Sequence, residues 1–189
     1  FRSCKIMGIK AVIPLKRRKY LSTDKEYLMP YLVKKENIIK ANDVWAVDIT
    51  YINYKNKTLY LIAIIDIYSR KALAHRIVEN MTAEACCDVL FLALKIGKPI
   101  ILNSDQGSQF TSQLWTSTLS AINIQISMDG VGRFVDNIFI ERLWRSAKYE
   151  CFYLNDFNTI DEVVCAAEKN LIFYYQKRFH QSLNYKTPD

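Results

Sequence analysis

Residues 44–52 form an almost continuous run of apolar, largely β-branched and aromatic residues, and this run constrains the fold more than any other segment. Such a pattern is typical of a strand buried on both faces of a sheet. One carboxylate, Asp48, lies in the middle of the run. Because a charge in a buried strand is costly unless a ligand or a partner compensates it, Asp48 is a candidate functional residue. A satisfied structural acid is the alternative.

The pattern that follows predicts an α/β domain. Polar turns at 54–57 and at Ser69-Arg70 separate this strand from two more, so three antiparallel strands open the domain. Helices then alternate with short strands. The predicted ranges are strands 59–67, 72–78, 100–103 and 122–126, and helices 83–95 (capped by Thr82), 111–120 and 159–177.

Composition indicates one globular domain. Half of the 189 residues are apolar, and glycines and prolines are few, with 5 and 4 respectively. This excludes collagen-like and disordered chains. Five cysteines without a C-x-x-C spacing favour buried thiols in a reducing cytosol over a disulfide framework or a zinc site. The longest apolar run, 59–65, is far shorter than the roughly 20 residues of a membrane span, so we expect a cytoplasmic protein without a membrane segment.

Positive charge is concentrated at the front of the chain. Residues 1–40 carry 11 Lys and Arg against 3 Asp and Glu, whereas residues 41–189 carry 15 against 16. The densest cluster is Lys16, Arg17, Arg18 and Lys19. We therefore predict a basic arm over residues 1–40 that binds a polyanion such as nucleic acid, followed by a folded core over 41–189. A merely solvated arm is the alternative.

Carboxylates are the candidate catalytic groups. The chain has no phosphate-binding P-loop, no H-E-x-x-H and no G-x-S-x-G pattern, and only two histidines, His75 and His180. Asp105 follows the strand predicted at 100–103 and precedes a glycine, at the strand end where α/β sheets bind ligands. Converging carboxylates stay ionised only beside a cation, and hard oxygen ligands select Mg²⁺ or Mn²⁺. Asp66 is better explained as an acceptor for the turn after it.

A third acid lies on the helix that follows residue 136. Asp136 or Asn137 can cap this helix. Its predicted core stripe consists of Ile140, Leu143, Trp144, Ala147 and Cys151, which assigns Trp144 to the core. Glu141, Arg145 and Lys148 share one edge beside that stripe, within about 60° of arc. Exposed helix charges are the alternative for the basic residues.

Three segments resemble the OrfB transposases of the insertion-sequence-three family. They are WAVDITYI (45–52), NSDQGSQFTS (103–112) and DNIFIERLWRSAKYE (136–150). Asp105 and Glu141 are separated by 35 residues, the interval of the family's Asp-Asp-Glu triad, and Lys148 stands seven residues after Glu141. The tail RFHQSLNY (178–185) is also similar.

The resemblance implies a ribonuclease-H-like fold of the retroviral-integrase superfamily, with a mixed five-stranded sheet flanked by helices. It implies a Mg²⁺-dependent polynucleotidyl transferase that cleaves and joins DNA strands, in which Asp48, Asp105 and Glu141 bind two Mg²⁺ ions, replaceable by Mn²⁺. Lys148 would contact a phosphate near the scissile bond, and Arg133, Arg142 and Arg145 would position the backbone. The implied partners are element ends, target DNA and further copies of the chain, at the bacterial nucleoid.

Two alternatives remain open at this stage. The sequence starts at Phe1, and residues 2–13 resemble the tail of an upstream helical DNA-binding region. A truncated, non-catalytic remnant that binds DNA or a sister transposase is therefore one alternative. A ribonuclease or resolvase built on the same core is the other.

Overall fold

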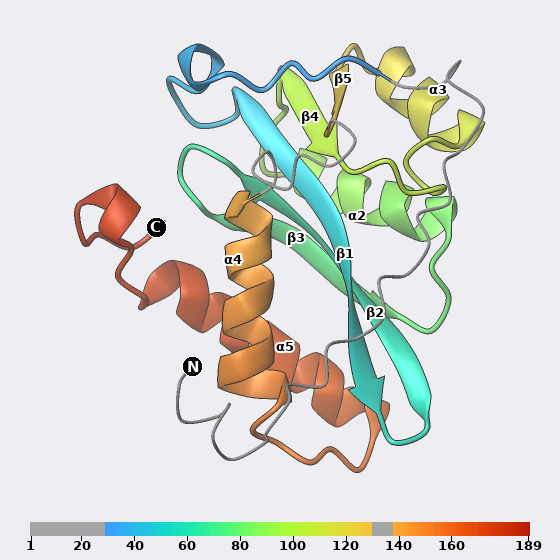
Figure 1. The fold of residues 1–189 in the computed structure, drawn as a ribbon, viewed down its shortest axis with the longest axis vertical. Helices are drawn as coiled ribbons and strands as arrows, with labels where there is room; N and C mark the ends of the chain where they lie inside the picture. Colours follow the sequence, from blue (N-terminus) through green and yellow to red (C-terminus); the bar gives the residue numbers. More distant parts are fainter. Residues whose placement is uncertain (1–28, 130–137) are drawn as a thin grey trace, which may run out of the picture.

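Five strands form one mixed sheet in the order β3-β2-β1-β4-β5 (Figure 1). The computed structural model describes residues 29–129 and 138–189. Strands β1 (Val44–Tyr54), β2 (Lys57–Asp66) and β3 (Ala72–Val78) are antiparallel, whereas β4 (Ile101–Ser104) and β5 (Gln125–Met128) run parallel to β1. The predicted mixed five-stranded sheet is confirmed.

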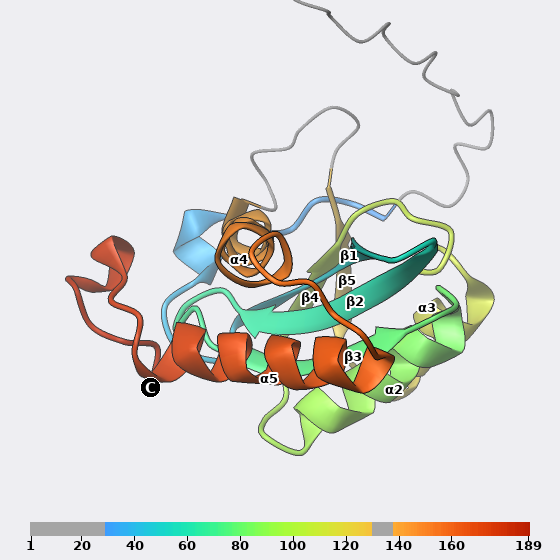
Figure 2. The same ribbon diagram turned by 90° about the horizontal axis from the view of Figure 1, so that it is seen from below.

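Helices cover both faces of the sheet, and Figure 2 shows α4 and α2 on opposite sides of it. Alternate residues of β1 enter different cores, as the strand period requires: Val44 and Ala46 pack with α4 and α5, whereas Trp45 and Val47 pack with α2 and α3. The helical segments are η2 (Lys35–Asn37), α2 (Ala83–Leu94), α3 (Gln113–Ala121), α4 (Ile138–Ala147), the π-helical η3 (Lys148–Phe152), α5 (Ile160–Gln176) and η4 (Gln181–Leu183).

The predicted core stripe of α4 is confirmed, because all five of its residues are buried. The position of β5 was predicted wrongly. The sequence analysis predicts a strand over residues 122–126, but Asn123 adopts a left-handed conformation with φ of 54°, and the Ile124 amide donates to the Leu119 carbonyl near the end of α3. The strand therefore starts at Gln125.

The last part of the predicted basic arm contacts the core. The Leu32 amide donates to Ser127 Oγ at 2.9 Å, and Val33 is buried in the core beside α4 and α5. Residues 1–28, including the basic cluster at 16–19, lie outside the described residues. The boundary near residue 40 therefore stays a prediction, with residues 32–33 attached to the sheet.

Three cysteines, Cys86, Cys87 and Cys151, are buried free thiols as predicted, whereas Cys165 is exposed. In the described part of the chain, no helix is both long and apolar enough to cross a membrane.

Asp66 is a structural acid, as predicted. It is 1% exposed, and its carboxylate accepts hydrogen bonds from the backbone amides of Asn42 (2.9 Å) and Ser69 (2.7 Å). These bonds join the turn after β2 to the start of β1.

We therefore expect Asp66→Asn to lower the free energy of unfolding by about 1–3 kcal/mol, because an amide group leaves one of the two partly buried N–H donors without an acceptor. Chemical denaturation measures the change. The exposed Asp88→Asn serves as the control, and an Asp66→Asn protein as stable as wild type would contradict the structural role.

Candidate active site

Asp48 lies beside Asp105 because of the strand register. The parallel ladder pairs Ala46 with Asn103, so continuing it by two residues puts Asp48 and Asp105 in the same row and on the same face of the sheet. Asp48 is half-buried and Asp105 is exposed, with its Oδ1 accepting from the Gly107 amide at 2.9 Å. The structure thus brings together two of the three predicted acids.

A third aspartate, Asp129, joins this row from β5. The ladder pairs Ser104 with Met128, so the next residues, Asp105 and Asp129, are level. The sequence analysis missed Asp129 because it ended the strand two residues too early. With β5 ending at Met128, the rule that selected Asp105, an acid directly after a strand, selects Asp129 as well.

Buried polar groups hold Asp129 in place. Asn103 Nδ2 donates to Asp129 Oδ1 at 2.7 Å, and Ser127 Oγ donates to Asn103 Oδ1 at 2.8 Å. Asn103 and Ser127 are both 0% exposed. Because the hydroxyl fixes the orientation of the amide, the network presents an N–H group to Asp129 without rearrangement.

The surroundings of Asp48 raise the pKa of its carboxyl group. Burial raises its pKa from 3.8 to about 6, a hydrogen bond from Trp144 opposes the rise, and the charges of Asp105 and Asp129 add to it. Oxygen donors that repel one another suit a hard divalent cation such as Mg²⁺. The chemistry of these oxygen donors therefore fits the predicted metal, although in this arrangement the three carboxylates of the row do not form a group that could hold an ion.

Trp144 has a role that the sequence analysis missed. Its ring is buried in the core as predicted, but its indole Nε1–H also donates to Asp48 Oδ2 at 2.8 Å. Helix α4 is thereby fixed over β1. A buried tryptophan generally finds an acceptor for its N–H group, which is the signal that could have indicated a polar partner.

Glu141 and Lys148 lie on either side of Trp144 along the helix. Lys148 Nζ is 4.1 Å from the centre of the Tyr51 ring on β1, and burial lowers its pKa while the charge of Asp48 opposes that effect. Glu141 is exposed. Within residues 29–129 and 138–189, no three His, Cys, Asp or Glu side chains form a group that could hold a metal ion. The convergence of Glu141 with the aspartates stays a prediction.

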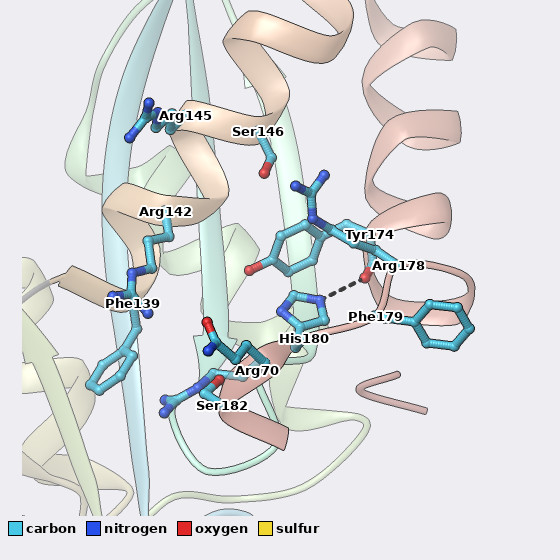
Figure 3. A pocket seen from close by; sticks show the side chains of 11 residues that line it. Arg70, Phe139, Arg142, Arg145, Ser146, Tyr174, Arg178, Phe179, His180 and Ser182 are labelled. Carbon is cyan, nitrogen blue, oxygen red and sulfur yellow. Dashed lines mark hydrogen bonds between the residues drawn. The ribbon is translucent and has the colours of Figure 1, made fainter. Parts of the chain in front are cut away.

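The predicted DNA-contacting arginines of α4 lie in a separate cavity of about 680 Å³ (Figure 3). Arg142 and Arg145 line it together with Arg70 and Arg178, which the sequence analysis did not select. Arg145 was expected to share an edge with Glu141 and Lys148, but neither of these lines the cavity. Arg133 and the cluster at 16–19 lie outside the described residues.

Comparison with protein families gives two matches, both described as integrase core domain, over residues 39–133 and 122–188. The transposase for insertion sequence element IS904 of Lactococcus lactis is 36% identical over 151 residues, which are 78% of this chain and 60% of that protein. The putative transposase InsK for IS150 of Escherichia coli K12 is 28% identical over 187 residues, or 96% and 66% of the two chains. The chain thus spans about two thirds or less of the length of these relatives.

Solved structures show the same fold. The HTLV-2 integrase catalytic core domain in complex with magnesium superposes with a TM-score of 0.62 at 20% identity, covering 80% of this chain and 96% of that one. A chain of the simian T-cell lymphotropic virus intasome gives a TM-score of 0.70 at 20% identity, with coverages of 87% and 59%.

We expect Trp144→Phe to raise the pKa of Asp48 above its value of about 6, because a hydrogen bond to the ionised form is lost. The free energy of unfolding at neutral pH should also fall by about 1–3 kcal/mol. NMR titration of the Asp48 carboxyl carbon measures the first effect. An unchanged pKa of Asp48 would contradict the role of the indole N–H group. As a control, Trp144→Phe should lower the free energy of unfolding by less in an Asp48→Asn protein than in wild type.

The raised pKa of Asp48 also predicts a pH dependence of stability without metal. The Asp48 carboxyl group binds its proton more tightly in the folded chain than in the unfolded chain. The stability that this proton contributes is therefore fully present below pH 3.8 and is lost as the pH rises through about 6. Asp48→Asn should therefore gain stability relative to wild type across this window. Thermal unfolding in EDTA measures the difference. Asp88→Asn, a change at an exposed acid, is the control. A stability difference between Asp48→Asn and wild type that does not change with pH would contradict the prediction.

Proposed function

Since the chain belongs to the integrase core domain family, among the OrfB-type transposases of the insertion-sequence-three group, we propose that it is the catalytic core of a DNA transposase. The observation that carries this proposal is the Asp48 carboxylate, which stands in one row with Asp105 and is hydrogen-bonded to the helix that carries Glu141. That arrangement joins two predicted triad members on the sheet to the element bearing the third.

The triad Asp48, Asp105 and Glu141 would hold the metal, with Mg²⁺ as the natural ion, Mn²⁺ as a substitute and two ions as the expected number. Bound there, the ions supply Lewis-acid activation of the attacking oxygen and stabilisation of the leaving oxygen. Glu141 lies one helical turn before Trp144, and Trp144 contacts Asp48, so Glu141 belongs to the same helix that lies beside the row.

The chain's own residues have three further tasks. Trp144 orients one oxygen of Asp48, and the buried Asn103 and Ser127 keep the floor of the site rigid. Lys148, which lies over the Tyr51 ring and near Asp48, would contact a phosphate next to the scissile bond. A protein nucleophile is not required: water attack on a phosphodiester leaves a 3′-hydroxyl and a 5′-phosphate, and the 3′-hydroxyl then attacks a second phosphodiester and displaces its 3′ oxygen.

The partners we propose are the ends of the mobile element, the target DNA and other copies of the chain. Structures similar to this fold are a dimeric HTLV-2 core domain and an intasome, which supports action as an oligomer on DNA. Such action would place the protein at the bacterial nucleoid.

The test is strand cleavage of a duplex that carries the terminal repeats of the parent element, with Mg²⁺ or Mn²⁺. We expect Asp48→Asn and Glu141→Gln each to lower the rate by more than about 100-fold, because even outer-shell changes at metal sites cost 10–100-fold. Asp88→Asn, an exposed acid paired with Arg76, is the control and should retain the wild-type rate. Gel analysis of end-labelled strands measures the rate.

Two results would contradict the proposal in different ways. Equal rates in wild type and Glu141→Gln would remove Glu141 from the triad. DNA binding by wild type without any metal-dependent cleavage would favour the non-catalytic remnant, and preferential cleavage of RNA–DNA hybrids would favour a ribonuclease.

A further inference from the structure

Four of the six arginines in residues 41–189 line a single cavity of about 680 Å³. They come from three separate segments: Arg70 from the turn between β2 and β3, Arg142 and Arg145 from α4, and Arg178 from the segment after α5. Figure 3 shows Arg142 to one side, Arg178 beside Tyr174 to the other, and Arg70 below them. None of the three aspartates of the carboxylate row lines this cavity.

Positive charge in the cavity is only partly neutralised. No Asp or Glu is among its lining residues. Arg178 forms an ion pair with Glu150, whereas Arg70, Arg142 and Arg145 form none with any carboxylate of residues 29–129 and 138–189. Burial lowers the pKa of Arg70, and the charge of Arg142 lowers it further, whereas Tyr174 and Asp66 oppose the shift without cancelling it. Guanidinium groups that crowd together in this way favour an anionic ligand.

Arg70 is held ready for a ligand. Its guanidinium lies 3.7 Å from the centre of the Phe139 ring, and its Nη1 donates to the Ile67 carbonyl. The backbone of Arg70 adopts a left-handed conformation, with φ of 66°, in the turn that Asp66 stabilises. Because this side chain is already ordered, little conformational entropy is lost when it binds an anion.

The lining residues favour a phosphate of a nucleic acid over a protein carboxylate. Arginine presents donors in a planar fork that matches phosphate oxygens, and the hydroxyl groups of Ser146 and Ser182 add further donors. Phe179, which is 71% exposed, stands at the same cavity. An exposed ring offers a stacking surface to a sugar or base, which a peptide carboxylate does not use.

Helix α4 connects this cavity with the carboxylate row. Trp144 points from one flank to Asp48, and Arg142 and Ser146 line the cavity from the other. The two sites are thus separated by about one helix diameter, roughly 10 Å. We propose that the arginine cavity binds a backbone phosphate of the DNA strand a few nucleotides from the reacting phosphodiester, so that the strand crosses α4. This proposal rests on the proposed function.

The test measures affinity of the full 189-residue chain for a labelled DNA duplex as a function of salt, by fluorescence anisotropy in EDTA and with Asp48→Asn throughout, so that catalysis plays no part. Arg142→Gln should raise Kd about tenfold, the loss expected of a charge-assisted hydrogen bond. It should lower the salt slope by less than the value of about 0.9 that one phosphate contributes, because Arg178 would still neutralise part of that phosphate's charge. The matched control is Arg76→Gln, an exposed arginine outside the cavity, which should leave both values unchanged.

A double variant tests whether the arginines act on one phosphate. Arg142→Gln with Arg178→Gln should lower the slope by about 0.9 in total, whereas independent contacts would lower it by about 1.8. Arg142→Lys should keep the slope because it keeps the charge. The proposal would be overturned if Arg142→Gln left the salt slope of DNA binding unchanged, or if it changed DNA binding no more than Arg76→Gln does. If Arg142→Gln altered self-association of the chain and not DNA binding, the cavity would be assigned to a protein contact. Absence of metal-dependent cleavage in the wild-type chain would instead count against the proposed function alone.

Discussion

The hydrogen bond between the Trp144 indole and the Asp48 carboxylate connects the sheet with the helix on which the rest of the site depends. It joins residues 96 positions apart in the sequence. A carboxylate in a central strand is unfavourable without a partner, and this bond provides one while leaving the charge partly accessible. The apolar stripe of α4 turns one face of the helix toward the core, and this bond adds a polar contact between that face and the Asp48 carboxylate.

The strand register decides which acids can act together. β1, β4 and β5 are parallel neighbours. Asp48 and Asp105 lie two residues beyond the last β1–β4 pair, and Asp105 and Asp129 lie one residue beyond the last β4–β5 pair. Asp48, Asp105 and Asp129 are brought level in this way although their local sequences are unrelated. The buried Asn103 and Ser127 below them show that this end of the sheet is built from polar groups that are fully hydrogen-bonded, which is a rigid setting for a charged ligand.

Opposite charges lie on the two sides of α4, although the net charge of the core is close to zero. Residues 41–189 have nearly equal numbers of acidic and basic residues, yet the acids of the row face one flank and four arginines gather at the other. With the metal proposed for it, the carboxylate row would suit the reacting phosphate of a DNA strand, and the guanidinium cavity would suit a neighbouring phosphate. One helix can therefore position a nucleic-acid strand through both.

The sequence by itself determined the elements whose signals are local. The strands β1–β3, the cap at Thr82 and the buried stripe of α4 were predicted correctly because apolar runs, capping residues and helical spacing are signals within one element, and the cost of a buried charge indicated Asp48. Only the tertiary structure decided the partner of Trp144, the start of β5 and hence Asp129, and the meeting of Arg70 and Arg178 with Arg142. These depend on strand register and on which distant segments pack beside α4, and both arise only when the chain folds together. Residue spacing within a segment carries no information about such partners.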